Sequence, residues 1–216
     1  MKKLIPALLF ILALAAPGAR ADTISAQVVA DDAFWLFVGN ESGTVMNSIK
    51  FDDDDWKVQG APFTFEVAAG DYIYVAGWDN KQSHQGWIGV FTNLTTGGVL
   101  YTNTTDWEAK WTTSGGKPVV PADVEALAGT GTWSLIGRSA PNNASPWGDA
   151  RVGGMLPGAD SASIIWHDTL VYPSASANGF ALYRTAAPIV PVPEPGTWLM
   201  LLSGLALLGF SARRRA

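Results

Sequence analysis

Apolar and polar residues alternate in short runs between residues 22 and 188, and this pattern predicts many β-strands. The runs are rich in Val, Ile, Thr and aromatic residues, and clusters of Gly, Asn, Ser and Asp that are typical of turns separate them. The expected strands are 23–29, 33–38, 44–51, 62–67, 72–78, 86–92, 99–102, 132–136, 163–166 and 180–184.

Two further segments refine the expected fold. Both alternating sets of 72–78 are apolar or aromatic, which favours a central strand with both faces covered. A short helix is expected at 121–128, because Pro121 suits a first helical turn and Gly129 suits the position after the last one. The sequence therefore predicts an all-β protein, an antiparallel two-sheet β-sandwich of jelly-roll type.

The first 21 residues are typical of a secretory signal peptide. Two lysines precede an apolar stretch at 4–16, and Ala19 and Ala21 provide the small residues of a cleavage site. The stretch is apolar all round, whereas a helix of the folded domain would need an amphipathic stripe. We expect the general secretion machinery to export the chain and signal peptidase to release a mature protein that begins at Asp22.

The C-terminal 25 residues combine three elements in a fixed order. A proline-rich linker at 186–193 leads to Pro193, Glu194 and Pro195, an apolar helix follows at about 197–212, and Arg213, Arg214 and Arg215 come last. The apolar run 197–210 would span roughly 21 Å as a helix, against about 30 Å for the hydrocarbon core of a bilayer. We therefore expect a marginal membrane span with its arginines on the cytoplasmic side. A permanent anchor is the alternative.

This order at 192–216 resembles the PEP-CTERM sorting signal. The resemblance implies a Gram-negative bacterium that makes extracellular polysaccharide, often in biofilms. It also implies a membrane protease of the exosortase type, which recognises the Pro-Glu-Pro element and removes the helix. The expected path is an inner-membrane-tethered precursor that ends at the cell surface or outside the cell.

Charge and cysteine content limit what the domain expected at 22–185 does. Residues 22–188 hold eighteen acidic residues against eight basic ones, a formal net charge of −10, which argues against nucleic acid as a partner. The chain has no cysteine, so the exported domain has no disulfide and depends on core packing or a bound ion.

Two stretches resemble galactose-binding-like jelly rolls and the lectin domains related to anthrax protective antigen. In 28–43 a strand, Asp31-Asp32, an apolar strand and a Gly/Asn turn follow one another, and 63–91 resembles the hairpin that comes next. The stretch 145–168 also looks like the closing part of such folds. Because a matching Asp-Asp holds calcium in the lectin-type relatives, the resemblance implies calcium at Asp31 and Asp32.

A second candidate calcium site is the acidic run 52–55. Calcium prefers six to eight oxygen ligands, and Asp53 and Asp55 could supply two of them. A solvated turn explains Asp31 and Asp32 at least as well, and a solvated loop is the favoured explanation of the acidic run, which lacks the spacing and glycine of an EF-hand loop.

Tryptophan is abundant, with ten in the chain and nine of them between residues 22 and 188. A small sandwich hides some of these in its core, yet sugar rings also stack on indoles. We expect Trp78, Asp79, Asn80 and the facing Trp87 to form a carbohydrate platform, with a purely structural role for each tryptophan as the alternative.

No catalytic motif accompanies the Ser, Asp and His residues of the domain, so we expect a protein that is not an enzyme. The predicted function is a non-catalytic module that binds exopolysaccharide or another glycan. A structural biofilm or surface-coat protein without a sugar site is the alternative, and a secreted glycan hydrolase is a third.

Overall fold

The described part of the chain is almost entirely antiparallel β-structure. This computed structural model describes residues 21–43, 47–53, 61–78, 85–112, 119–145, 147–150, 152–167, 180–189 and 203–205. The chain divides into two compact units, residues 21–190 and a unit formed by 1–20 with 191–216. Of the second unit only the helical residues 203–205 are described.

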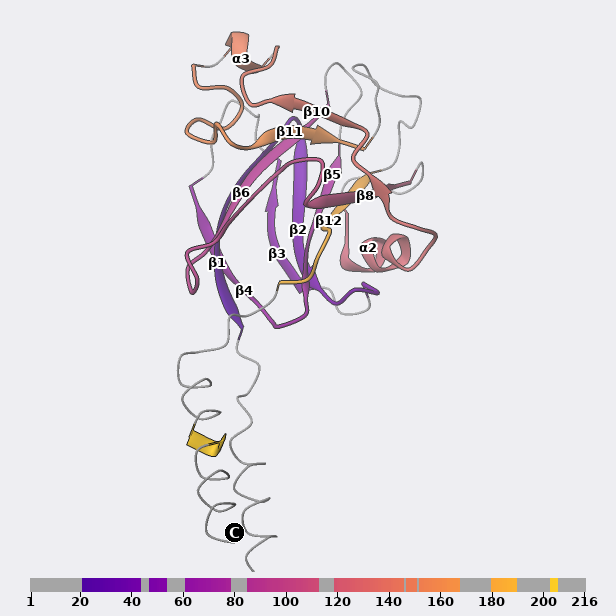
Figure 1. Ribbon diagram of the computed structural model, residues 1–216. Coiled ribbons are helices and arrows are strands. Elements are labelled where there is room, and N and C mark those ends of the chain that lie inside the picture. Colours follow the sequence, from indigo (N-terminus) through magenta and orange to yellow (C-terminus); the bar gives the residue numbers. More distant parts are fainter. Residues whose placement is uncertain are drawn as a thin grey trace, which may run out of the picture. The chain divides into compact units, whose positions relative to one another are not determined.

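The strands form two sheets in which every neighbouring pair is antiparallel (Figure 1). In sheet A the order is β10 (Arg138–Pro141), β11 (Ser163–Trp166), β6 (Trp87–Asn93), β1 (Asp22–Ala30) and β4 (Phe63–Val67), and β7 (Val99–Tyr101) also pairs with β6. In sheet B the order is β3 (Asn47–Asp52), β2 (Ala33–Gly39), β5 (Tyr72–Trp78), β12 (Ala181–Thr185), β8 (Trp107–Trp111) and β9 (Ser134–Leu135). The predicted antiparallel two-sheet β-sandwich is confirmed.

The main core lies between the sheets. Alternate residues of β1 point inward, and Ile24, Ala26 and Val28 meet residues such as Leu36 of β2 and Val75 of β5. Burying a side chain of this size stabilises the fold by about 1.5–3 kcal/mol. Without a disulfide, this packing is what holds the two sheets together.

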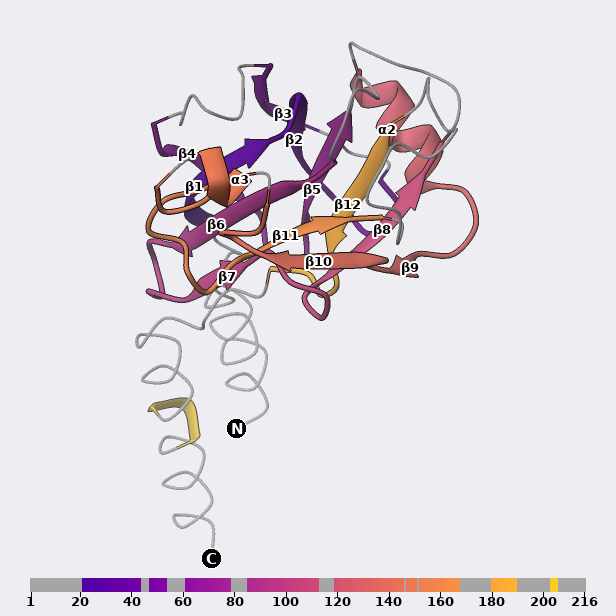
Figure 2. The same ribbon diagram turned by 90° about the horizontal axis from the view of Figure 1, so that it is seen from above.

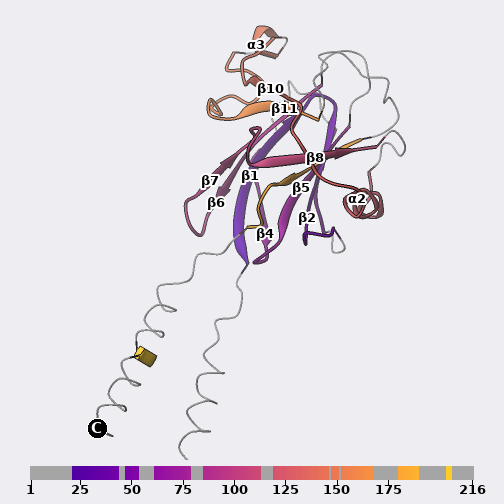
Figure 3. The same cartoon turned by 45° about the vertical axis from the view of Figure 1, so that its right-hand side comes forward.

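Each sheet also has a covered outer face. On sheet B the helix α2 (Pro121–Ala128) packs its buried Val124 and Ala128 against aromatic residues of β2 and β5. On sheet A the short helix α3 (Trp147–Ala150) and residues 152–162 cover Val29 of β1 and Ile88 of β6. Figure 2 shows α2 beside β8 and β12, and Figure 3 shows α3 next to β10. The outer faces of both sheets are therefore covered over their central strands, and β5 is buried on two faces, as expected for 72–78.

Several predicted elements agree with the structure, and some differ. The helix 121–128 and the strand 163–166 have the predicted bounds, whereas β8, β10 and α3 were not predicted. No helix in the described ranges is long and apolar enough to cross a membrane. Apart from 203–205, the span expected at 197–212 lies outside those ranges, as does the signal peptide before Ala21.

The predicted linker at 186–193 needs correction at its start. The Ala186 N–H donates to the Asp106 carbonyl at 2.8 Å, and the Ile189 N–H donates to the Asp71 carbonyl at 2.8 Å. Ile189 also packs against the core between the sheets. Residues 186–189 belong to the folded domain, because it offers them backbone partners and an apolar contact.

Candidate functional site

Most residues assigned to export and sorting lie outside the described residues. This holds for Ala19, for the Pro193-Glu194-Pro195 element and for the arginines at 213–215. The domain itself begins close to the predicted cleavage point, because β1 starts at Asp22. The Asp22 side chain is buried, and its Oδ2 accepts a hydrogen bond from Nδ2 of Asn93 at 2.8 Å.

The structure corrects the predicted sugar platform at Trp87. This indole has 0% exposure and lies in the core, where it contacts the rings of Trp107 and Tyr183 at centroid distances of 5.0 and 5.3 Å. A side chain enclosed in this way offers no face to a sugar. Trp78 is half-buried beside the aromatic cluster under α2, and Asp79 and Asn80 lie outside the described residues.

The predicted calcium ligands are only partly described. Asp31 and Asp32 form the bend between β1 and β2, and Oδ1 of Asp31 accepts a hydrogen bond from Nε1 of Trp147 at 3.1 Å. Asp53 is exposed after β3, and Asp55 lies outside the described residues. Among the residues that the structure describes, no group of three or more His, Cys, Asp or Glu could hold a metal ion. Calcium binding stays a prediction.

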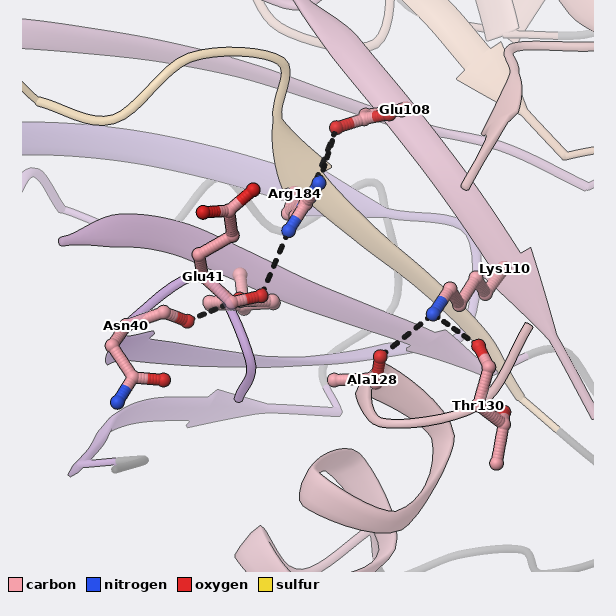
Figure 4. A network of polar contacts seen from close by, with 8 residues as sticks. Asn40, Glu41, Glu108, Lys110, Ala128, Thr130 and Arg184 are labelled. Carbon is pink, nitrogen blue, oxygen red and sulfur yellow. Dashed lines mark hydrogen bonds and ion pairs between the residues drawn. The ribbon is translucent and has the colours of Figure 1, made fainter. Parts of the chain in front are cut away.

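A cationic network crosses the outer face of sheet B next to α2. The register places Arg184 of β12 between Tyr74 of β5 and Glu108 of β8. Its guanidinium pairs with Glu108 at 2.8 Å and donates to the Glu41 carbonyl at 2.9 Å (Figure 4). It also lies 4.3 Å from the ring centre of Trp133. These contacts tie three strands and two loops together.

Tyr74 belongs to the same network. Its hydroxyl donates to the Asn40 carbonyl at 2.6 Å, and burial raises the pKa of this phenol although the Arg184 guanidinium opposes the shift. The tyrosine therefore stays neutral at physiological pH and acts as a hydrogen-bond donor.

Lys110 of β8 closes the network at the end of α2. Its ammonium donates to the carbonyls of Ala128, at 2.6 Å, and Thr130 (Figure 4). It also stacks over Trp133, 4.6 Å from the ring centre. Burial lowers the pKa of Lys110, and the nearby Arg184 adds to the effect. A cation at these carbonyls also suits the negative end of the helix dipole, so Lys110 acts as a structural clamp.

A pocket of about 210 Å³ opens beside this clamp, at the edge of sheet B. Its walls come from the end of β8, the end of α2 and the loop that leads to β9, with Lys110, Trp111, Leu127, Thr130, Gly131, Thr132 and Ser134 as lining residues. Because β9 pairs only with Glu108 and Ala109 of β8, the strand end at Trp111 extends past it.

Trp111 is the prominent residue of the pocket. Its indole is 47% exposed and stacks on the imidazole of His167, with 5.0 Å between the ring centres and 19° between the planes. His167 also contacts Trp166, which is buried in the core. Trp111 is thus an exposed aromatic residue. Its ring packs on His167, which in turn packs on the buried Trp166, and this packing fixes its orientation.

The sequence analysis missed this pocket because it missed β8. In 107–111 the pattern is Trp, Glu, Ala, Lys, Trp, and two charges within five residues are unusual for a buried strand. The alternation of Trp107, Ala109 and Trp111 on one face was the available signal. What the local sequence could not reveal is that Glu108 and Lys110 find partners on distant segments.

The comparisons with known proteins concern the end of the chain. Residues 191–215 match a family described as the PEP-CTERM protein-sorting motif. The match confirms the sorting signal predicted at 192–216, and it indicates an exported protein with an exosortase as its processing partner. No curated protein and no solved structure matches the chain.

Proposed function

We propose that this exported protein is a non-catalytic module that binds extracellular polysaccharide at the Trp111 pocket. The observations that carry the proposal are the half exposure of Trp111 and its place in the lining of a pocket that also includes the hydroxyl-bearing residues Thr130, Thr132 and Ser134. The kinship with lectin-type jelly rolls inferred from 28–43 and 63–91 agrees with this function and stays a prediction.

The chemistry of the pocket suits a sugar. A pyranose ring presents a face of C–H groups that packs on an aromatic ring, while its hydroxyls exchange hydrogen bonds with side chains and backbone. Specificity for a ligand with many hydroxyls requires such polar partners around an apolar contact. The pocket provides both, and the indole needs little reordering because His167 already supports it.

Binding to purified polysaccharides tests the proposal. We expect the wild-type domain to bind at least one extracellular glycan in isothermal titration or a glycan array, and Trp111→Ala to weaken this binding at least tenfold. Phe51→Ala is the matched control, because Phe51 is also a half-exposed aromatic of sheet B, at 43%, but lies on β3. Equal losses in both variants, or no glycan binding at all, would contradict the proposal.

A surface-coat protein that self-associates through its sheet edges is the alternative. Edge strands that avoid such pairing are short, bulged, charged or carry proline. β9 has two residues, β10 ends at Pro141, and β3 faces a register shift at Leu36/Phe37 and carries the Lys50–Asp52 ion pair. These features favour the binding module over the coat protein. A hydrolase remains the third reading, and turnover of the bound glycan would establish it.

A further inference from the structure

After β12 the chain stays attached to the domain for four residues, which we call the strap (residues 186–189). Two hydrogen bonds join its end to one turn, because the Ile189 N–H donates to the Asp71 carbonyl at 2.8 Å and the Gly70 N–H donates to the Ile189 carbonyl at 3.1 Å. A third bond joins Ala186 to Asp106 at 2.8 Å. The Ile189 side chain is half-buried against the core. The strap is therefore docked through both its backbone and its side chain.

The docking site exists only in the folded domain. The turn that receives Ile189 connects β4 of sheet A to β5 of sheet B, and it depends on Gly70, whose φ of 88° favours glycine. The residue that ends β4, Val67, pairs with Asp22 at the start of β1. The first strand and the strap thus both lie beside this turn. The strap can dock only when β4 of sheet A and β5 of sheet B are both in place.

The sorting motif begins two residues after the strap, since the match covers residues 191–215 and the last docked residue is Ile189. Proteases commonly hold a substrate as an extended strand through its backbone N–H and C=O groups. In the strap these groups are already engaged at Ile189 and Ala186. An exosortase that approaches from the motif meets occupied backbone at Ile189, two residues before the motif begins.

We propose that the strap is a latch that restrains exosortase processing: cleavage at the sorting motif is slow while Ile189 is docked and becomes faster when the strap is released. Because the docking site forms only when the domain has folded, the latch delays removal of the membrane helix from the folded precursor. When a segment opens and closes faster than it is cut, the cleavage rate follows the population of the open form. Weakening the dock therefore accelerates processing.

A pulse-chase experiment in cells that contain the exosortase tests the latch with the full-length chain. We expect Ile189→Ala to be processed about five- to tenfold faster than the wild type, the factor by which losing three half-buried side-chain carbons shifts the opening equilibrium. Ile49→Ala is the matched control, because Ile49 is also a half-buried isoleucine packed against the same core but lies on β3. Equal rates in the wild type and Ile189→Ala, or equal acceleration in both variants, would overturn the latch.

A second variant tests the latch without changing Ile189, in case Ile189→Ala is degraded in the cell before its processing can be measured. Four residues of Gly and Ser inserted after Val190 leave the strap intact and give the protease free chain, so we expect processing to accelerate here as well. Hydrogen exchange of the purified precursor should show protected amides at Gly70 and Ile189 in the wild type and in the insertion variant. Unprotected amides, or an insertion without effect on the rate, would overturn the latch while leaving glycan binding at Trp111 untouched.

Discussion

Arg184 carries more contacts than any other charge described on the outer face of sheet B. Its guanidinium pairs with Glu108, donates to the Glu41 carbonyl and lies against the rings of Tyr72 and Trp133. Breaking a buried pair by removing one partner is expensive, because the remaining charge loses its compensation. Arg184 therefore matters for stability more than for ligand chemistry.

We expect Arg184→Met to lower the free energy of unfolding by about 2–4 kcal/mol. Urea unfolding of the domain measures this loss. Adding Glu108→Gln to Arg184→Met should recover part of it, since no carboxylate is then left uncompensated. A loss below about 1 kcal/mol would show that solvent already screens the pair.

Lys110 gives a prediction for pH dependence. Its pKa lies below the ordinary 10.5 because of burial and the Arg184 charge. Between the lowered pKa and 10.5 the unfolded chain binds more protons than the folded one, so the free energy of unfolding rises with pH in this window. We expect the wild type to gain stability relative to Lys110→Met as pH rises towards 10.5. A constant difference between the two proteins would contradict the shift.

The sequence indicated that the tryptophans would be divided between core and surface, but it did not identify which of them are exposed. The abundance of tryptophan correctly indicated that some indoles are core and others exposed. Which is which depends on the sheet that covers each strand: Trp87 is enclosed because β8 and β12 of the opposite sheet face it, whereas Trp111 extends past its neighbour β9. These partners lie 20 to about 100 residues away in sequence, and no local pattern encodes them.

At the scale of elements, the cover of sheet A depends on one asparagine and the glycines around it. The Asn142 side chain accepts from the Leu156 N–H at 2.9 Å and donates to the Leu156 carbonyl at 2.7 Å. Gly154 has a φ of 80°, and a Cβ there would lie 2.3 Å from the Asn142 carbonyl oxygen. Gly158 has a φ of 86° with nothing within 4 Å.

The two glycines form a matched pair for mutation. We expect Gly158→Ala to cost about 1–2 kcal/mol for its left-handed backbone alone. Gly154→Ala should cost at least about 2 kcal/mol more, because it adds a clash with backbone that cannot move without breaking the Asn142 contacts. Thermal or urea unfolding of both variants measures the difference. Equal costs would show that the loop relaxes freely.

Elements with local signals were predictable, and elements held by distant partners were not. Pro121 and Gly129 mark the ends of α2 in the sequence itself, and 163–166 contains a continuous run of β-branched and aromatic residues, which is typical of a buried strand. β8 was missed because its charged residues have partners that are distant in sequence: Glu108 pairs with Arg184, and Lys110 donates to a carbonyl at the end of α2. The start of the linker was misjudged for a similar reason, since its proline-rich composition hides the docking of Ile189.

At the scale of the whole molecule, the sheet edges predict the oligomeric state of the domain. Four of the five edge strands in the described structure carry features that hinder pairing, since β7 has only three residues, and β4 is the remaining one. We expect residues 21–190 to sediment as a monomer at micromolar concentration. A stable oligomer that Thr64→Lys on β4 dissociates would favour the coat-protein alternative instead.

Calcium binding is tested at the same scale. An ion that binds only the folded domain increases the free energy of unfolding by mass action, by about 2.7 kcal/mol when its concentration is one hundred times its dissociation constant. The unfolding temperature rises as a result. Thermal unfolding with calcium and with a chelator, for the wild type and for Asp31→Asn with Asp32→Asn, measures this effect. A calcium shift that the double variant loses would support the lectin-type site, and no shift in the wild type would remove it.

The place of β12 in sheet B has a mechanical consequence. This strand is held on both sides, by β5 and by β8, and its residue Ala181 faces Trp111 while its other end leads to the strap. A force applied to a glycan at Trp111 would therefore act along β8 and reach β12 through five paired residues. These pairs would be loaded in shear, so they share the force and do not separate one after another. Under the proposed function, the sugar site and the strap lie at opposite ends of the paired β8–β12 segment, an arrangement suited to carrying a load along the strands.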